Sequence, residues 1–244
     1  ISTARFGSLD LHVDTKPDLT PVTDADRAVE QALRKALARS RADDAVLGEE
    51  YGDTPSSEPE TKGARRWVID PIDATKNVVR GVPVWATLIG LVDGDTSVVG
   101  VVSAPALGQR WWAARGHGSW TARSGAAPRR NRISGVAAMS DASVSYSDLG
   151  DWGDRKTGFD ALVTGAWRTR AYGDFWSHML VAEGAVDISA EPEVSIWDVA
   201  ALVPVVEEAG GRVTGVDGGK SPLAPSIVCT NGLLHDEALR LLER

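Results

Sequence analysis

The stretch WVIDPIDATKN, residues 67–77, raises the question on which the fold and the chemistry depend. It begins with three large apolar residues, as a buried strand does, and then places two aspartates around a proline and an isoleucine. Asp and Pro are also common at the ordinary end of a strand. The alternative is a strand that ends at a site, where a rigid turn directs Asp70, the Ile72 carbonyl and Asp73 at one point. Three converging oxygens suit a hard divalent cation such as Mg²⁺.

The composition of the 244-residue chain excludes several classes of protein. With 43% hydrophobic residues and no apolar run long enough to cross a bilayer, no membrane is expected. A formal net charge of −8 argues against nucleic acid as a partner, because phosphate backbones are bound through Lys and Arg. A single cysteine, Cys229, allows no intrachain disulfide and no thiolate zinc cluster. We therefore expect a reducing, cytoplasmic location and oxygen ligands for any metal.

The first half of the chain combines helical and strand patterns. Residues 23–40 carry apolar residues on one helical face behind the N-cap pair Thr23 and Asp26, which predicts a helix. Residues 53–63 are rich in Pro, Ser and acid and predict a surface loop. Strands in an antiparallel meander are expected at about 84–92, 97–102 and 110–114.

The second half alternates strands with helices, after a Gly-, Pro- and Arg-rich segment at 125–135 that marks a domain boundary. The expected strands lie near 143–147, 167–171, 185–189, 212–216 and 226–230, and the helices near 154–164, 174–183, 197–209 and from about 232. Such alternation implies a sheet covered by helices. We expect an α/β protein, with an α+β domain over residues 1–133 and an α/β domain over residues 134–244.

Acidic residues recur where apolar runs end. They are Asp24 and Asp26 in TPVTDAD, Glu49 and Glu50 in LGEE, Asp70 and Asp73, and Asp198 in SIWDVA. Each has an ordinary reading as a solvated turn or a first-turn helix acid. Asp198, however, lies between Trp197 and the apolar VAALVPVV, an unusual place for a solvated carboxylate.

The motifs GEE, WVIDPIDATKN and IWDVA, in this order and spacing, resemble the inositol monophosphatase family of Mg²⁺-dependent, lithium-sensitive phosphatases. The resemblance runs from TPVTDAD through GHGSW and EAGGRVT to TNGLLHD. It implies a layered αβαβα sandwich, two or three Mg²⁺ in each active site, a small phosphate monoester as substrate and a homodimer.

The resemblance also assigns roles to residues. It implies that Asp24 and Thr75 activate the attacking water, and that the N–H groups of Ala74 and Thr75 meet the phosphate at the start of a short helix. The implied metal ligands are Glu49, which is counted as catalytic as well, Asp70, the Ile72 carbonyl, Asp73 and Asp198.

Substrate specificity is expected in the segments RAYGDFWSHML and ISAEPEVSIWD. Asp174 stands where inositol-specific members have a small neutral residue, although it could simply cap a helix. Glu191 matches an acid that contacts the alcohol, and Arg170 opens the first segment and is placed with the substrate-binding residues. Lys16 matches a loop that closes over the metals, or is an ordinary solvated lysine.

Within the family, TKPDLTPVTDADRAVE, DATKNVVRGVPVW and YGDF resemble the histidinol-phosphate phosphatases of histidine biosynthesis. Extra carboxylates favour a substrate that carries an ammonium and an imidazole more than they favour a neutral polyol. The alternatives are an inositol-1-monophosphatase or a broader sugar or nucleotide phosphatase of the family, a metal-free glycosidase, and an inactive phosphate-binding module.

Two features depart from the family pattern. Ala74 stands where the family has Gly, which is harmless at a negative φ and costly at a positive φ. Relatives carry a longer helix before RFGSLDL, and because the chain opens with Ile1 we expect the natural N-terminus to be longer.

Overall fold

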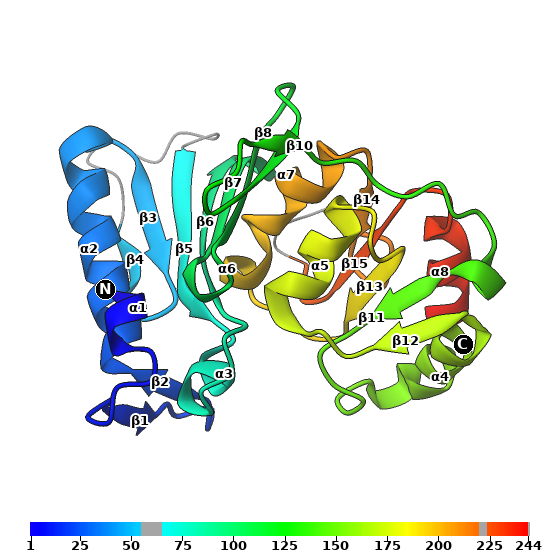
Figure 1. Cartoon of the computed structure of the whole chain (residues 1–244), viewed down its shortest axis with the longest axis horizontal. Coiled ribbons are helices and arrows are strands. Elements are labelled where there is room, and N and C mark those ends of the chain that lie inside the picture. The colour runs from blue at the N-terminus through cyan, green and yellow to red at the C-terminus, as the bar shows by residue number, and fades with distance from the viewer. Residues whose placement is uncertain (55–64, 220–223, 244) are drawn as a thin grey trace.

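The computed structural model describes residues 1–54, 65–219 and 224–243. Five layers follow one another along its long axis (Figure 1): an outer helix, a large sheet, a middle layer of helices, a smaller sheet and an outer helix pair. The helices of these layers are α2 (Asp24–Ser40), then α5 (Asp174–Ala182), α6 (Ile196–Val199) and α7 (Leu202–Glu207), then α4 (Lys156–Gly165) and α8 (His235–Leu242). The αβαβα sandwich is therefore confirmed. None of the described helices combines the length and the apolar character needed to cross a membrane.

The described part of the large sheet has the strand order β10-β9-β8-β7-β6-β5-β3-β4. From β5 onward it is the expected antiparallel meander, while β3 pairs with β5 in parallel. Its strands are β3 (Ala45–Gly48), β4 (Gly52–Thr54), β5 (Arg65–Asp73), β6 (Ala86–Asp93), β7 (Thr96–Ala104), β8 (Gln109–Ala114), β9 (Ser119–Arg123) and β10 (Arg129–Arg130). Asp53 and Thr54, expected in a loop, belong to β4, and the rest of that loop lies outside the described residues.

Shorter elements flank this sheet. Their bounds are α1 (Ser2–Arg5), the hairpin of β1 (Val13–Thr15) and β2 (Pro21–Thr23), α3 (Thr75–Val79), and the 3₁₀ turns Pro105–Leu107, Met139–Asp141 and Gly153–Arg155. Helix α3 directly follows β5, as the ATKN segment predicted.

The smaller sheet has the order β12-β11-β13-β15-β14. Strands β11 and β12 and strands β11 and β13 pair in parallel, whereas β15 is antiparallel to both of its neighbours. The strands are β11 (Ser143–Ser145), β12 (Arg168–Arg170), β13 (Ile188–Glu191), β14 (Arg212–Thr214) and β15 (Ile227–Thr230). The proposed boundary at residue 133 falls between β10, the last strand of the large sheet, and β11.

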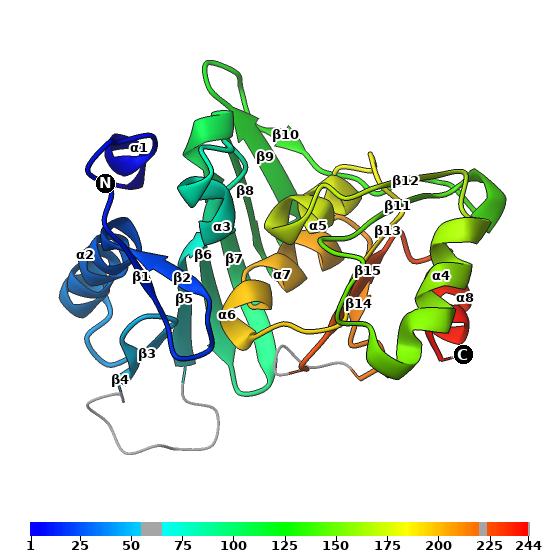
Figure 2. The same cartoon turned by 90° about the horizontal axis from the view of Figure 1, so that it is seen from below.

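The helix expected at about 197–209 is two short helices, α6 and α7. Pro204 explains the break, because it cannot donate a hydrogen bond back to the preceding turn and is tolerated only in the first turn of a new helix. Two glycines of the large sheet bring this corner close. A Cβ at Gly90 would lie 2.8 Å from the Ala200 carbonyl carbon, and one at Gly100 would lie 2.0 Å from the Ala201 oxygen. Because glycine has no side chain at these two positions, the α6–α7 corner packs directly against β6 and β7 (Figure 2).

Candidate active site

The parallel pairing of β3 with β5 stops at the carboxyl end of β3. Gly48 of β3 lies opposite Ile69 of β5, and the Glu49 N–H donates to the Ile69 carbonyl at 3.1 Å. Both strands run in the same direction and their pairing ends at Gly48 and Ile69, so the next residue of each, Glu49 and Asp70, lies at the same end of the sheet. This is the arrangement that the apolar runs ending in acids predicted.

A β-bulge explains the Asp-Pro-Ile-Asp spacing. Residues three apart on a regular strand face opposite sides of the sheet. Here Asp70 pairs with Leu88 of β6 but Asp73 pairs with Ala86, so β5 contains one extra residue between the two aspartates. A bulge also accommodates Pro71, whose missing N–H costs no regular ladder bond there. The extra residue turns both carboxylates to one side.

Three aspartates converge at this point. Carboxylate oxygens of Asp70, Asp73 and Asp198 all lie within 4.8 Å of one another. Asp198 comes from the middle layer, where it is also the N3 residue of a capping box: its Oδ2 accepts from the Ser195 N–H at 2.6 Å. The ordinary reading of Asp198 and the functional one are therefore both satisfied by the same side chain.

The acids of the cluster are held close together in a buried place, where their negative charges repel one another. Burial, followed by repulsion from neighbouring acids, raises the pKa of Asp70 and that of Asp73 well above the ordinary value, and raises the pKa of Asp198 to about 7. Asp70 is only 2% exposed, and its Oδ1 has no hydrogen-bond partner among the described residues. Oxygen donors that repel one another and include an unsatisfied buried atom fit a hard divalent cation.

Lys16 lies over the neighbouring glutamates. In the segment between β1 and β2, its Nζ lies 2.7 Å from Glu49 Oε1 and 2.6 Å from Glu50 Oε1. Burial opposes the charge on Lys16, but the hydrogen bonds to the two glutamates outweigh it and raise the pKa of Lys16. Lys16 is therefore not an ordinary solvated lysine.

Glu30 of α2 supports the Glu49–Glu50 turn and was missed by sequence reasoning. Its fully buried carboxylate accepts from the Glu50 N–H at 2.8 Å and from the Tyr51 N–H at 3.2 Å. A Cβ at Gly48 would lie 2.0 Å from Glu30 Oε1, so the glycine of the GEE motif makes room for this contact. An acid four residues after Asp26, on the same helical face, was the available signal.

The structure corrects the pairing expected for Asp24. The Asp24 carboxylate is 42% exposed and forms an ion pair with Arg5 at 2.7 Å. Asp26 instead accepts a hydrogen bond from Thr75 Oγ1 at 3.2 Å through its Oδ1, while its Oδ2 completes the capping box with Thr23. The cap directs the Asp26 carboxylate back along the helix axis toward Thr75, whereas Asp24 points to the outside.

Ala74 and Thr75 form the start of α3, directly after Asp73 of the acidic cluster. Thr75 Oγ1 also lies 2.9 Å from the Ile72 carbonyl oxygen, the backbone group expected to bind a metal. Ala74 has φ +69° and ψ +46°, so the family glycine is replaced at a left-handed position. The replacement of glycine by Ala74 therefore costs conformational energy, because a residue with a Cβ is disfavoured at positive φ.

The expected specificity residues are divided by the structure. Glu191, at the end of β13, is 7% exposed, accepts a hydrogen bond from Ser147 Oγ at 2.7 Å, and has its pKa raised by burial to about 8. Asp174 does not cap α5, because Gly173 holds the cap position and Asp174 is the first residue of the helix. Burial raises the pKa of Asp174. Besides burial, the negative charge of Asp174 repels that of Asp73 and raises the pKa of Asp73. Arg170 is exposed on the edge strand β12 and donates to the Thr169 carbonyl at 2.7 Å, so this contact directs it away from the acids.

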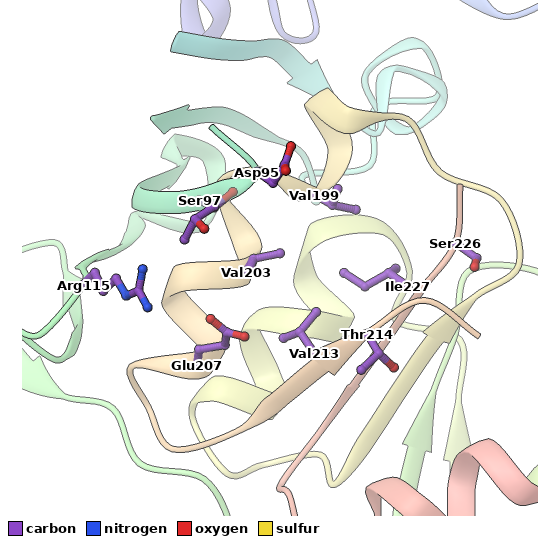
Figure 3. Close-up of a pocket in the computed structure, with 11 residues that line it drawn as sticks. Asp95, Ser97, Arg115, Val199, Val203, Glu207, Val213, Thr214, Ser226 and Ile227 are labelled. Atoms are coloured by element: carbon purple, nitrogen blue, oxygen red, sulfur yellow. The ribbon is translucent and has the colours of Figure 1, made fainter. Parts of the chain in front are cut away.

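A separate pocket of about 240 Å³ lies between the two sheets (Figure 3). Valines and an isoleucine form its apolar part, with polar and charged side chains around them. None of the residues that line it is among the expected site residues, although Val199 directly follows Asp198. We therefore keep the acidic cluster as the candidate active site.

Comparison with known proteins agrees with this geometry. The sequence matches the inositol monophosphatase family over residues 2–244. A histidinol-phosphatase of Mycobacterium tuberculosis is 57% identical over 99% of this chain and 92% of its own length, and one of Streptomyces coelicolor is 53% identical over 98% and 90%. Among solved structures, the extragenic suppressor protein suhB of Bartonella henselae superposes with a TM-score of 0.89 at 25% identity, covering 100% of this chain and 93% of that one. The chain belongs to the inositol monophosphatase family.

Proposed function

We propose that the protein is a Mg²⁺-dependent phosphatase that hydrolyses L-histidinol phosphate to L-histidinol and phosphate in histidine biosynthesis. The observation that carries the proposal is the pairing of two acidic groups: the Asp70, Asp73 and Asp198 cluster, and beside it the half-buried Asp174 and the buried Glu191. The first group suits cations and phosphate, and the second suits a cationic alcohol. Relatives at 57% and 53% identity bear the name histidinol-phosphatase.

Two or three Mg²⁺ ions would bind at the acidic cluster and its neighbouring residues. The residues that would hold them are Glu49, Asp70, the Ile72 carbonyl, Asp73 and Asp198. Bound cations supply charge neutralisation for the phosphate and for the attacking and leaving oxygens. Lys16 forms ion pairs with Glu49 and Glu50 and would balance part of their negative charge.

Thr75 and Asp26 would orient the attacking water. A hydroxyl has one proton, and Thr75 Oγ1 faces two acceptors, Asp26 Oδ1 and the Ile72 oxygen. With the Ile72 oxygen holding a cation, the Thr75 proton would go to Asp26. A lone pair of Thr75 would then accept a hydrogen bond from the water and orient it for attack on phosphorus. The N–H groups of Ala74 and Thr75 would bind the phosphate oxygens.

Asp174 and Glu191 would face the alcohol part of the substrate. Both lie in partly dry surroundings, where a carboxylate binds an ammonium by a charge-assisted hydrogen bond. The metals bind the phosphate in the same way in every monoester, so the choice between substrates must come from these groups.

We further propose a cytoplasmic homodimer. The single cysteine, Cys229, is buried and free, as suits a reducing compartment. Val101, Trp112 and Trp120 align across β7, β8 and β9 on the face of the large sheet opposite the middle layer, and this apolar row would meet a second copy. Light scattering in solution tests the dimer, and a monomeric mass at micromolar concentration would contradict it.

The function is tested with a panel of phosphomonoesters, with Mg²⁺ and with EDTA. We expect L-histidinol phosphate to be hydrolysed much faster than inositol 1-phosphate, and only with Mg²⁺. Asp174→Asn should lower the efficiency for histidinol phosphate by roughly one to two powers of ten, as loss of one charge-assisted contact predicts, with less effect on inositol 1-phosphate. Comparable wild-type rates on the two substrates would favour an inositol monophosphatase, and no phosphate release would favour a binding module. Activity that EDTA does not change would exclude a metal requirement.

A further inference from the structure

Three consecutive backbone N–H groups at the start of α5 each donate to a side-chain oxygen. Gly173 and Asp174 have positive φ values of +81° and +48°, a backbone that an aspartate adopts only when its surroundings hold it there. The turn is therefore held by its acceptors. The three hydrogen bonds run from Gly173 N to Ser177 Oγ at 2.9 Å, from Asp174 N to Ser147 Oγ at 2.7 Å, and from Phe175 N to Asp73 Oδ2 at 2.9 Å.

Strand register places Ser147 beside Glu191. Ser145 of β11 pairs in parallel with Ser189 of β13, so two residues further along each strand Ser147 comes level with Glu191. The Ser147 Oγ lies 2.7 Å from Glu191 Oε1. Because the Asp174 N–H can only donate, Ser147 accepts there, and its single proton goes to Glu191.

Ser147 is the group that favours a charged Glu191. Burial raises the pKa of Glu191 to about 8, and the hydrogen bonds from Ser147 act in the opposite direction. The other titratable groups around Glu191 give no such help. Asp174 from α5 and Asp148 after β11 repel it, Cys229 of β15 keeps its proton because burial raises its pKa, and burial keeps His178 of α5 neutral with a pKa of about 4.

We propose that Ser147 is a positioning and specificity-determining residue, which orients the Glu191 carboxylate and ties it to the turn that carries Asp174. Through this link the site prefers phosphate monoesters whose alcohol part is cationic. The inference rests on the proposed function. It adds a residue that contacts neither the expected metal ligands nor the phosphate-binding N–H groups, and that acts through two neighbours at once.

The test compares Ser147→Thr with Ser147→Val, two side chains of nearly equal shape that differ in the hydroxyl. In Ser147→Val, and equally in Ser147→Ala, we expect the ratio of kcat/KM for L-histidinol phosphate to that for inositol 1-phosphate to fall about tenfold, mainly through KM, as loss of one charge-assisted hydrogen bond predicts. Ser147→Thr should keep most of the ratio.

The pH profile separates this role from a merely structural one. A cationic alcohol binds more tightly as the pH rises through the Glu191 titration, so inhibition by L-histidinol should strengthen over that range. Removal of the Ser147 hydroxyl should move the midpoint of this rise to higher pH. The matched control is Ser177→Ala, which removes the acceptor of Gly173 N but leaves the donor to Glu191, and should not move the midpoint.

The outcomes distinguish the inference from the proposed function. If the wild-type enzyme does not prefer L-histidinol phosphate, the proposed function fails. Thermal denaturation first establishes that the Ser147→Val variant is folded. If the wild type has the preference but this variant keeps both the kcat/KM ratio and the midpoint of the pH profile, the role of Ser147 is overturned. An equal shift in Ser177→Ala would also overturn it, because the turn alone would then be responsible.

Discussion

At the proposed phosphate end of the site three aspartates repel one another, whereas at the proposed alcohol end hydrogen bonds join Glu191, Ser147 and the Asp174 N–H. Asp70 keeps an unsatisfied buried oxygen, and its pKa is raised well above the ordinary value by burial and by its neighbours. Glu191 accepts from Ser147, which accepts in turn from Asp174 N. We therefore expect cations to stabilise the first end, whereas hydrogen bonds between protein groups hold the side chains of the second.

The largest expected effect comes from removing a charge at the phosphate end. Asp70→Asn and Asp73→Asn should each lower kcat by about 10³-fold, the scale of losing a key electrostatic group in a dry site. The same change relieves repulsion, so the metal-free variants should unfold at a higher temperature than the wild type. Steady-state kinetics and thermal denaturation in EDTA measure the two effects. Activity like that of the wild type in either variant would contradict the role of these aspartates in catalysis.

Asp26 and Asp24 provide a matched pair for the catalytic contact. Asp26→Asn should lower kcat by about 10²-fold, as loss of a group that orients the water through Thr75 predicts. Asp24→Asn removes only the ion pair with Arg5 and should leave kcat within about twofold, since exposed pairs contribute little. Thr75→Ala should resemble Asp26→Asn. If Asp24→Asn is the more damaging variant, the assignment from the structure is wrong.

A smaller effect is expected from pH at the alcohol end. The pKa of Glu191 is raised by burial from 4.5 to about 8, so the folded state holds this proton more tightly than the unfolded chain does. Its contribution to stability is therefore complete below the unfolded pKa and is lost as the pH rises through about 8. In EDTA, urea denaturation should show less pH dependence in Glu191→Gln than in the wild type across this range. Parallel curves for the two proteins would show that Glu191 titrates normally.

The smallest effect concerns the turn between β5 and α3. Ala74 has φ +69°, and a left-handed backbone costs a non-glycine residue roughly 1–2 kcal/mol. Ala74→Gly should therefore stabilise the protein, by less than that cost because glycine gains entropy in the unfolded chain. Chemical denaturation measures the change, and lower stability of the glycine variant would mean that Ala74 is not strained.

Local patterns in the sequence predicted the elements that carry the phosphate end. The apolar run before Glu49 forms β3, the run before Asp70 forms the first part of β5, and Thr23 with Asp26 caps α2. These features depend on neighbours in the chain and on strand and helix periodicity, and they are therefore readable without a structure.

Only the tertiary structure decided which of these groups meet. Asp24 and Asp26 are two residues apart, and the choice between them depended on the capping box and on the position of Thr75, far away in the sequence. The bond between Ser147 and Glu191 required the parallel register of β11 and β13, which no local pattern specifies. Contacts between distant segments follow from packing and strand pairing. For that reason the sequence alone determined the acids and their strands, while the folded chain decided their partners.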